Sequence, residues 1–338
     1  HDLQTYFNIK LEKILNKLGK KLMGWDEIMT PNMPTTAVIH SWRGENEGLT
    51  KGGSLIKAAK KGYQTVLSNG YYIDRMLPIE HHYTIDPIGN AILTEAEQSR
   101  ILGGEATMWS ELVTPLTIDS RIWPRTAAIA ERFWSPQNIN NVDDMKKRLK
   151  KVSFQLEELG LTHIKNRDVI LRSMTNNQDI TALITLSKIC EPLKIYARNK
   201  DGIEYKTYSP FMLFADACVV DATDASALNH TVISFINDEN NTTKVLFYLN
   251  NWAKNHDNYM KLEKNPKIQP LESLSKNLSE VSLLLSNAIQ NKSISTKNLN
   301  AVKNHIKILN TPFVDVEVVI VDTLKALTAY CETKYLSN

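Results

Sequence analysis

Cysteine and long apolar runs are scarce in this 338-residue chain, and each shortage excludes a class of protein. The three cysteines, Cys190, Cys218 and Cys331, are far apart, match no metal-binding spacing and form no even-numbered disulfide framework. Their apolar surroundings predict buried, inert thiols. No run of about 18 apolar residues occurs, so we expect no membrane span.

Excess charge of one sign is also lacking. The formal net charge is +3, and no basic stripe with interleaved aromatic residues occurs, so we expect no nucleic-acid partner. The chain is 42% hydrophobic and 23% charged, which is typical of globular proteins. Its length suits two domains of the usual ~100–200 residues each.

Glycine and tryptophan become rare in the second half: 11 of the 13 glycines and five of the six tryptophans precede residue 135. We therefore expect a domain over residues 1–160 and a second, α-helical domain over 161–338. The first half alternates predicted strands and helices, which indicates parallel strands joined by crossover helices. These strands are expected at residues 21–24, 36–40, 65–67 and 101–103, with helices over 53–61 and 124–133. In the second half, apolar stripes predict long helices, the last of them from Asp315 to Tyr330.

Aromatic and acidic residues cluster directly after the four predicted strands. In barrels of parallel strands, the functional groups lie on the loops that follow the strands. Tryptophan faces also suit the apolar face of a sugar ring. Core packing is the alternative interpretation of these tryptophans. The clusters are Gly24-Trp25-Asp26-Glu27, His40-Ser41-Trp42, Tyr72-Ile73-Asp74, and Gly103-Gly104-Glu105 continuing to Trp109-Ser110-Glu111.

In these four motifs, taken in this order, residues 1–160 resemble glycoside hydrolase family 20, the β-N-acetylhexosaminidases. The second half resembles, more loosely, the extra domain of such enzymes from Bacteroidetes-type bacteria. The resemblance implies an α/β plus all-α fold, with the C-terminal half of a (β/α)8 TIM barrel (strands five to eight) followed by an α-helical domain. It also implies a retaining, substrate-assisted hydrolase of terminal N-acetylglucosamine or N-acetylgalactosamine residues, periplasmic or secreted, without a metal or other cofactor.

The resemblance assigns roles to six residues. Tyr72 would donate a hydrogen bond to the substrate's acetamido oxygen, which is the nucleophile of an oxazolinium-forming reaction. Tyr71 is the alternative, since a shift of one residue would exchange the two. The remaining five would bind substrate: Trp25, Trp42 and Trp109 as walls around the sugar, and Asp74 and Glu111 as acceptors for its hydroxyl groups.

The family's catalytic Asp-Glu pair, in a His-Xaa-Gly-Gly-Asp-Glu motif, does not occur in this chain. The chain is therefore interpreted as the C-terminal part of a longer enzyme, inactive alone, with the first half of the barrel as its missing partner. Asp26-Glu27 lies in a different motif and is interpreted as structural, as is Glu105. The alternative is a non-catalytic carbohydrate-binding or structural remnant of such an enzyme.

Two further groups are given structural roles. Adjacent His81 and His82 cannot both face one metal ion on a regular element, so a solvent-exposed loop is expected. A charged network is expected to tie the last strand to its helix, formed by Arg121, Arg125, Glu131 and Arg132. The helical domain receives no function from its sequence, and a dimer contact and an accessory sugar-binding role both stay open.

Overall fold

The computed structural model describes residues 2–44, 53–202 and 213–337. The chain divides into two compact units. Unit 1 comprises residues 1–110 and 122–156, and unit 2 comprises residues 111–121 and 157–338. Segment 111–121 thus packs with the second unit although it precedes the last two long helices of the first.

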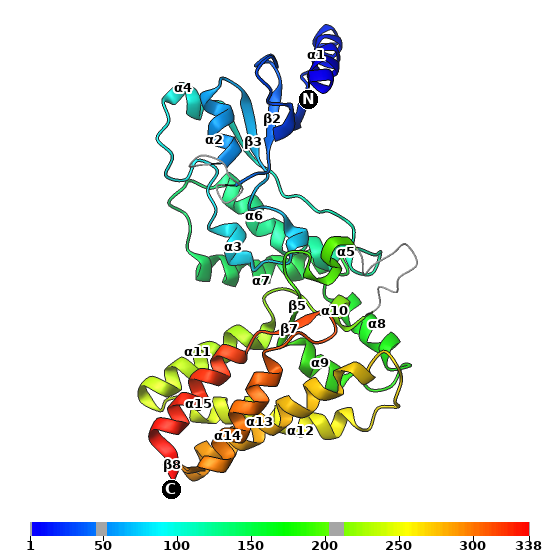
Figure 1. Ribbon diagram of the computed structural model, residues 1–338. Coiled ribbons are helices and arrows are strands. Elements are labelled where there is room, and N and C mark those ends of the chain that lie inside the picture. Colours follow the sequence, from blue (N-terminus) through cyan, green and yellow to red (C-terminus); the bar gives the residue numbers. More distant parts are fainter. Residues whose placement is uncertain (1, 45–52, 203–212, 338) are drawn as a thin grey trace. The chain divides into compact units, whose positions relative to one another are not determined.

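Unit 1 contains a parallel sheet of four strands in the order β1-β2-β3-β4, each strand beside the next one in the chain (Figure 1). The strands are β1 (Met23–Trp25), β2 (Val38–Ser41), β3 (Gln64–Leu67) and β4 (Ile101–Gly104). All four lie within a few residues of the segments predicted to form strands, and the crossover between β2 and β3 carries α2 (Gly53–Lys60). The remaining helices of unit 1 are α1 (Asp2–Lys17), η1 (Asp26–Ile28), η3 (Ile73–Arg75), α3 (Ile79–Tyr83), α4 (Glu95–Gln98), α6 (Arg125–Trp134) and α7 (Val142–Glu158).

A β-bulge interrupts the pairing of β3 with β4. Thr65 lies opposite Ile101, but the next residue, Val66, lies opposite Gly103, so Leu102 is the extra residue. Gly103 has φ +130°, a conformation that favours glycine. Past the bulge the ladder resumes, because the Glu105 N–H donates to the Leu67 carbonyl at 2.9 Å. A bulge changes the direction of the side chains that follow it, and this bulge precedes the predicted substrate-binding motif Trp109-Ser110-Glu111.

The apolar face of α1 points away from the sheet. Leu3, Phe7 and Ile14 are 80%, 59% and 55% exposed, whereas the polar Thr5 and Glu12 are buried. The Thr5 hydroxyl donates to that of Thr30 at 3.1 Å, and Glu12 accepts from Thr36. Within the described part of the chain, nothing covers this apolar face.

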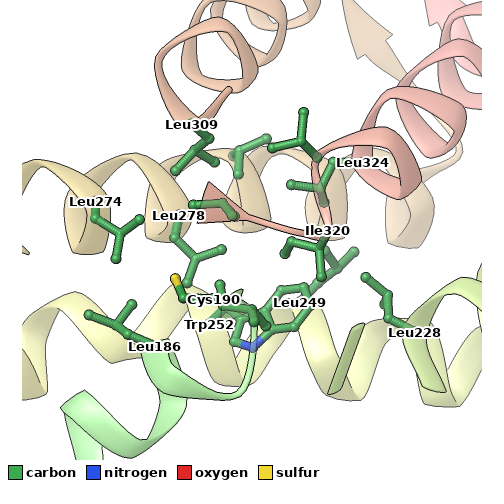
Figure 2. Packing of buried hydrophobic residues seen from close by; sticks show 14 of the residues in the cluster. Leu186, Cys190, Leu228, Leu249, Trp252, Leu274, Leu278, Leu309, Ile320 and Leu324 are labelled. Atoms are coloured by element: carbon green, nitrogen blue, oxygen red, sulfur yellow. The ribbon is translucent and has the colours of Figure 1, made fainter. Parts of the chain in front are cut away.

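Unit 2 is mainly helical, with two small two-stranded sheets. Its core is one large apolar cluster in which Leu249 and Trp252 of one helix meet Leu274 and Leu278 of the next (Figure 2). One of the apolar stripes predicted in the second half is buried along its whole length; it consists of Leu271, Leu274, Leu278, Val281, Leu285 and Ala288. The helices are α5 (Ile118–Ile122), α8 (Lys165–Met174), α9 (Thr181–Ser187), η4 (Ala197–Gly202), α10 (Phe214–Ala217), α11 (Thr223–Asp238), α12 (Thr242–Tyr259), η5 (Gln269–Leu271), α13 (Glu272–Asn291), α14 (Thr296–Leu309) and α15 (Val321–Tyr335), and the strands are β5 (Cys190–Pro192), β6 (Ile294–Ser295), β7 (Val316–Val318) and β8 (Leu336–Ser337).

The prediction of one helix from Asp315 to Tyr330 was wrong at its start. Residues 316–318 form β7, which pairs antiparallel with β5, and α15 begins only at Val321. The three cysteines are free and buried, as predicted. Burial raises the pKa of the Cys331 thiol to about 12, so this group stays protonated and unreactive at neutral pH.

The four residues of the predicted charged network each bind different partners. Within unit 1, Arg125 donates to the Ile73 carbonyl at 2.7 Å and Arg132 donates to the Ile139 carbonyl at 2.8 Å. Glu131 accepts instead from Tyr83 and Arg148. Arg121 belongs to unit 2, where it pairs with Asp216 at 3.2 Å. Buried guanidinium groups here mostly satisfy backbone carbonyls, which a charge pattern in the sequence cannot reveal.

The placement of His82 in a solvent loop was also wrong. This residue lies in α3 and is fully buried, and its Nδ1 donates to the Gly70 carbonyl at 2.6 Å. Its Nε2 has no hydrogen-bond partner among the described residues, so a second proton would be buried unpaired. Burial first, and then the charge of Arg125, lowers the pKa of His82 to about 4.

His82 should make the fold sensitive to acid. Its pKa is lower in the folded than in the unfolded state, where it is about 6.5, so the unfolded state binds more protons between these values. The stability that His82 contributes should be complete above pH 6.5 and lost as the pH falls to 4, by roughly 3 kcal/mol in total. Urea unfolding across this range measures the loss. His82→Asn keeps the Nδ donor and cannot titrate, so its stability should fall less steeply, and equal slopes would contradict this assignment.

Candidate active site

The ends of β1 and β2 bring two aromatic rings together. Trp25 and His40 are register partners, and their rings stack with centroids 3.9 Å apart and an angle of 6° between the planes. Trp109 is a second neighbour of Trp25, with ring centroids 5.9 Å apart and an angle of 37° between the planes. Trp109 is 41% exposed, so this group of rings is open to solvent. Such a surface can hold the apolar face of a sugar ring.

A polar group adjoins these rings at the ends of β3 and β4. The His40 Nε2 contacts a Glu105 carboxylate oxygen. The same oxygen lies 3.4 Å from the hydroxyl groups of Ser68 and Thr107, which are 2.7 Å apart. Glu105 therefore joins three strand ends, and the imidazole of His40 is held between a carboxylate and the Trp25 ring.

Tyr72 enters this polar group through the backbone. It forms a parallel bridge with Thr107, and the Ile73 N–H donates to the Thr107 carbonyl at 3.0 Å. Arg75 lies over the Tyr72 ring, 4.8 Å from its centroid. Burial raises the pKa of the Tyr72 phenol, while an interaction with Ser68 and the charge of Arg75 oppose that rise. Tyr72 is therefore protonated at neutral pH and can donate a hydrogen bond.

Tyr71, the alternative to Tyr72, has a different environment. Its side chain is fully buried and packs edge-on against Phe133, with ring centroids 4.6 Å apart. Its hydroxyl donates to the Ile85 carbonyl at 2.8 Å. Tyr71 is thus a core residue whose only donor is already used.

Asp26 and Glu27 are engaged with the loop after β2. Asp26 is buried and accepts from the Arg43 N–H at 3.1 Å, and burial raises the pKa of its carboxyl. Glu27 pairs with the Arg43 side chain at 2.6 Å and accepts from the Trp42 indole N–H at 3.3 Å. Arg43 also lies 4.9 Å from the Trp42 ring centroid. The Asp-Glu pair therefore positions Trp42.

Three of the six predicted site residues lie around one polar group. Trp25, Trp109 and Tyr72 lie around the polar group of His40, Glu105, Ser68 and Thr107. Trp42 follows β2, and Asp74 lies in η3, two residues after Tyr72. Glu111 is exposed and is counted in unit 2.

No site role was predicted for His40 or Glu105, and the structure places both beside the predicted site residues. His40 appeared only as part of a motif, and Glu105 was given a purely structural role. The signal for His40 was its strand position, because parallel pairing of the two predicted strands would set it beside Trp25. For Glu105 there was no such signal, since its position depends on the bulge in β4.

No metal site and no membrane-spanning helix are found in the described ranges. No three His, Cys, Asp or Glu side chains gather there in a way that could hold a metal ion. None of the helices described is both long and apolar enough to cross a membrane.

Comparisons with known proteins show that the first half of the chain is similar to one family. Residues 1–137 match the model of glycosyl hydrolase family 20, catalytic domain. A Beta-hexosaminidase of Porphyromonas gingivalis is 30% identical over 181 residues, which are 48% of this chain and 22% of that protein. Beta-hexosaminidase subunit A2 of Dictyostelium discoideum is 30% identical over 176 residues, again 48% of this chain and 31% of that protein.

One solved structure is similar along nearly the whole chain. The X-ray structure of Flavobacterium johnsoniae chitobiase is 51% identical with a TM-score of 0.92, and the match covers 97% of this chain. The present chain spans 50% of that protein and smaller fractions of the two hexosaminidases. Together with the family model, this match indicates an enzyme fold that contains a TIM barrel and additional helices.

Proposed function

Because residues 1–137 match the model of the catalytic domain of glycosyl hydrolase family 20, we propose that this chain is the substrate-binding part of a retaining β-N-acetylhexosaminidase. Its substrates would be glycans that end in N-acetylglucosamine or N-acetylgalactosamine, met in the periplasm or outside the cell. The observation that carries the proposal is the group of rings around Trp25 next to a protonated phenol, all at the carboxyl ends of parallel strands.

The proposed chemistry uses the substrate's own acetamido group. Its oxygen attacks the anomeric carbon, the bond to the leaving group breaks, and an oxazolinium intermediate forms that water then opens with overall retention. Tyr72 would donate its proton as a hydrogen bond to that oxygen and hold it near the carbon. Trp25, Trp42 and Trp109 would enclose the sugar, with Asp74 and Glu111 accepting from its hydroxyl groups. The general acid, a carboxylic acid, would come from outside these 338 residues.

We also propose that the sheet of unit 1 is the second half of a (β/α)8 barrel. Both β1 and β4 pair on one side only within the described residues, and a strand edge of this kind invites a further strand. The exposed apolar face of α1 and the 54% exposed Leu102 of β4 would be covered in a closed barrel. Leaving them in water costs the stability that burial of apolar area provides.

A non-catalytic carbohydrate-binding remnant is the second candidate function. The Asp-Glu pair near the site favours this second function. Asp26 and Glu27 bind Arg43 and Trp42, so their carboxylates already have a structural role. The two candidates differ in whether a first half of the barrel with its own Asp-Glu pair joins this chain. A polypeptide that lacks such a pair altogether would favour the remnant.

Hydrolysis of 4-nitrophenyl N-acetyl-β-D-glucosaminide tests the proposal. We expect no turnover by the 338-residue chain alone and rapid turnover by a polypeptide in which the preceding barrel half is joined to it. Glu27→Gln serves as a control, because in the joined enzyme its effect should be modest and confined to KM through Trp42. Turnover by the chain alone, abolished in Glu27→Gln, would instead assign the chemistry to Asp26 and Glu27. An inactive joined polypeptide that still binds the sugar would favour the remnant.

A further inference from the structure

Unit 2 contains a pocket of about 450 Å³ that the proposed reaction does not use. It is lined by side chains from α9, from the first turn of α11 and from α12, all of which belong to this unit. The volume falls within the usual range of small-molecule sites, about 300–1,000 Å³.

Aromatic residues of α12 form one wall of this pocket. Phe247 and Tyr248 lie with ring centroids 5.9 Å apart, and Tyr248 and Trp252 with centroids 5.7 Å apart. Trp252 is 1% exposed and packs into the core cluster beside Leu249 (Figure 2), whereas Phe247 is 62% exposed. The wall is thus anchored in the core at one end and offers a free aromatic face at the other. Such faces stack on the apolar side of a pyranose ring.

Three asparagines of the same helix add amide groups to the lining. Asn255 is buried and donates to the Ala182 carbonyl at 3.2 Å, which fixes its orientation. The Asn258 side-chain oxygen accepts from Lys261 at 3.1 Å, so its NH₂ group is the part left to donate. Asn251 is exposed at the pocket. Amides both donate and accept, as recognition of hydroxyl and acetamido groups requires.

The charges at the pocket are nearly balanced. Lys188 and Lys254 oppose Asp224, and the Asp224 N–H donates to the Lys188 carbonyl at 3.1 Å, which joins α11 to the end of α9. A site for a polyanion would carry a larger excess of positive charge. The lining therefore suits a neutral, hydroxyl-rich ligand with apolar ring faces.

We propose that this pocket is a second carbohydrate-binding site, for oligosaccharides of β-linked N-acetylhexosamine. Phe247 and Tyr248 stack on the sugar rings, and Asn251 and Asn258 bind their hydroxyl and acetamido groups. That the pocket binds sugar rests on its own lining. That the sugar is an N-acetylhexosamine rests on the proposed function.

Titration calorimetry of the 338-residue chain with triacetylchitotriose and with cellotriose tests both parts. Phe247→Ala should weaken chitotriose binding by about tenfold or more, because an aromatic anchor is lost. Phe154→Ala is the matched control, since Phe154 is 52% exposed on α7 in unit 1 and its loss should change nothing. Asn251→Ala, another exposed position, should weaken binding with the fold unchanged, as thermal unfolding can verify.

Each other result has a defined meaning. The proposal that this pocket binds sugar is overturned if binding survives Phe247→Ala but is lost in Trp109→Ala. It is also overturned if no binding is detected. Equal affinity for cellotriose overturns the acetamido preference. If the joined polypeptide fails to hydrolyse the chromogenic substrate but chitotriose binding still depends on Phe247, the proposed function is overturned. The proposal that the pocket binds sugar then stands.

Discussion

In the joined enzyme, Tyr72→Phe should lower kcat by about 10²- to 10³-fold, the usual loss when one donor to a developing charge is removed. Phenylalanine keeps the ring that lies under Arg75 and loses only the hydroxyl, which burial keeps protonated at neutral pH. Since the hydrogen bond is needed most as the acetamido oxygen attacks, KM should change far less than kcat. Steady-state hydrolysis of the chromogenic substrate measures both constants.

Tyr71→Phe is the matched control for this experiment. It removes the neighbouring hydroxyl, which donates to the Ile85 carbonyl inside the core. We expect a loss of stability of about 1 kcal/mol and an unchanged kcat. The reverse pattern, with kcat lost in Tyr71→Phe and kept in Tyr72→Phe, would transfer the proposed role to Tyr71.

Asp216→Ala should lower the free energy of unfolding of unit 2 by about 3–5 kcal/mol, because it removes the carboxylate that two buried guanidinium groups share. One carboxylate oxygen of Asp216 accepts from Arg121 at 3.2 Å and from Arg198 at 2.9 Å, and all three side chains are at most 3% exposed. The other oxygen accepts from the Leu213 N–H at 3.1 Å at the start of α10. Burial lowers the pKa of Arg121 to about 10, which shows how poorly solvated this guanidinium is. Urea unfolding of the variant measures the loss.

An exposed ion pair in the same unit supplies the comparison for Asp216. Lys303 and Glu332 lie 2.8 Å apart, but their side chains are 48% and 40% exposed. Glu332→Ala should therefore change stability by no more than about 1 kcal/mol. If the two variants lost similar amounts, the buried cluster around Asp216 would not have the importance given to it here.

The strands and long helices of this chain were predictable because their signals are local. Short apolar segments followed by clusters of glycine, polar and aromatic residues marked the four strands, and the stripe from Leu271 to Ala288 marked α13. Pairing between distant segments was not predictable. The strand at 316–318 exists because it pairs with β5, more than 100 residues away in the sequence, and the local pattern there favoured a helix.

The candidate site was predictable to the extent that strand ends determine it. Trp25 ends β1, and Tyr72 and Trp109 lie in the segments that follow β3 and β4; the structure gives each of them neighbours among the same polar and aromatic groups. Glu111 lies only two residues beyond Trp109, yet it is counted in the other unit. Spacing along a loop carries little information about position in space, whereas spacing along a strand carries much.

The bulge at Leu102 constrains how this gene can change in length. Side chains alternate between the two faces of a strand, so removing Gly104, past the bulge, would turn Glu105 and Thr107 away from His40 and Ser68, whereas removing Leu102 would leave Gly103 opposite Val66. Relatives should therefore lack Leu102 more readily than they lack any single residue between Gly103 and Thr107. An alignment gap of a single residue in this stretch would mark a relative whose polar group at the strand ends has been dismantled.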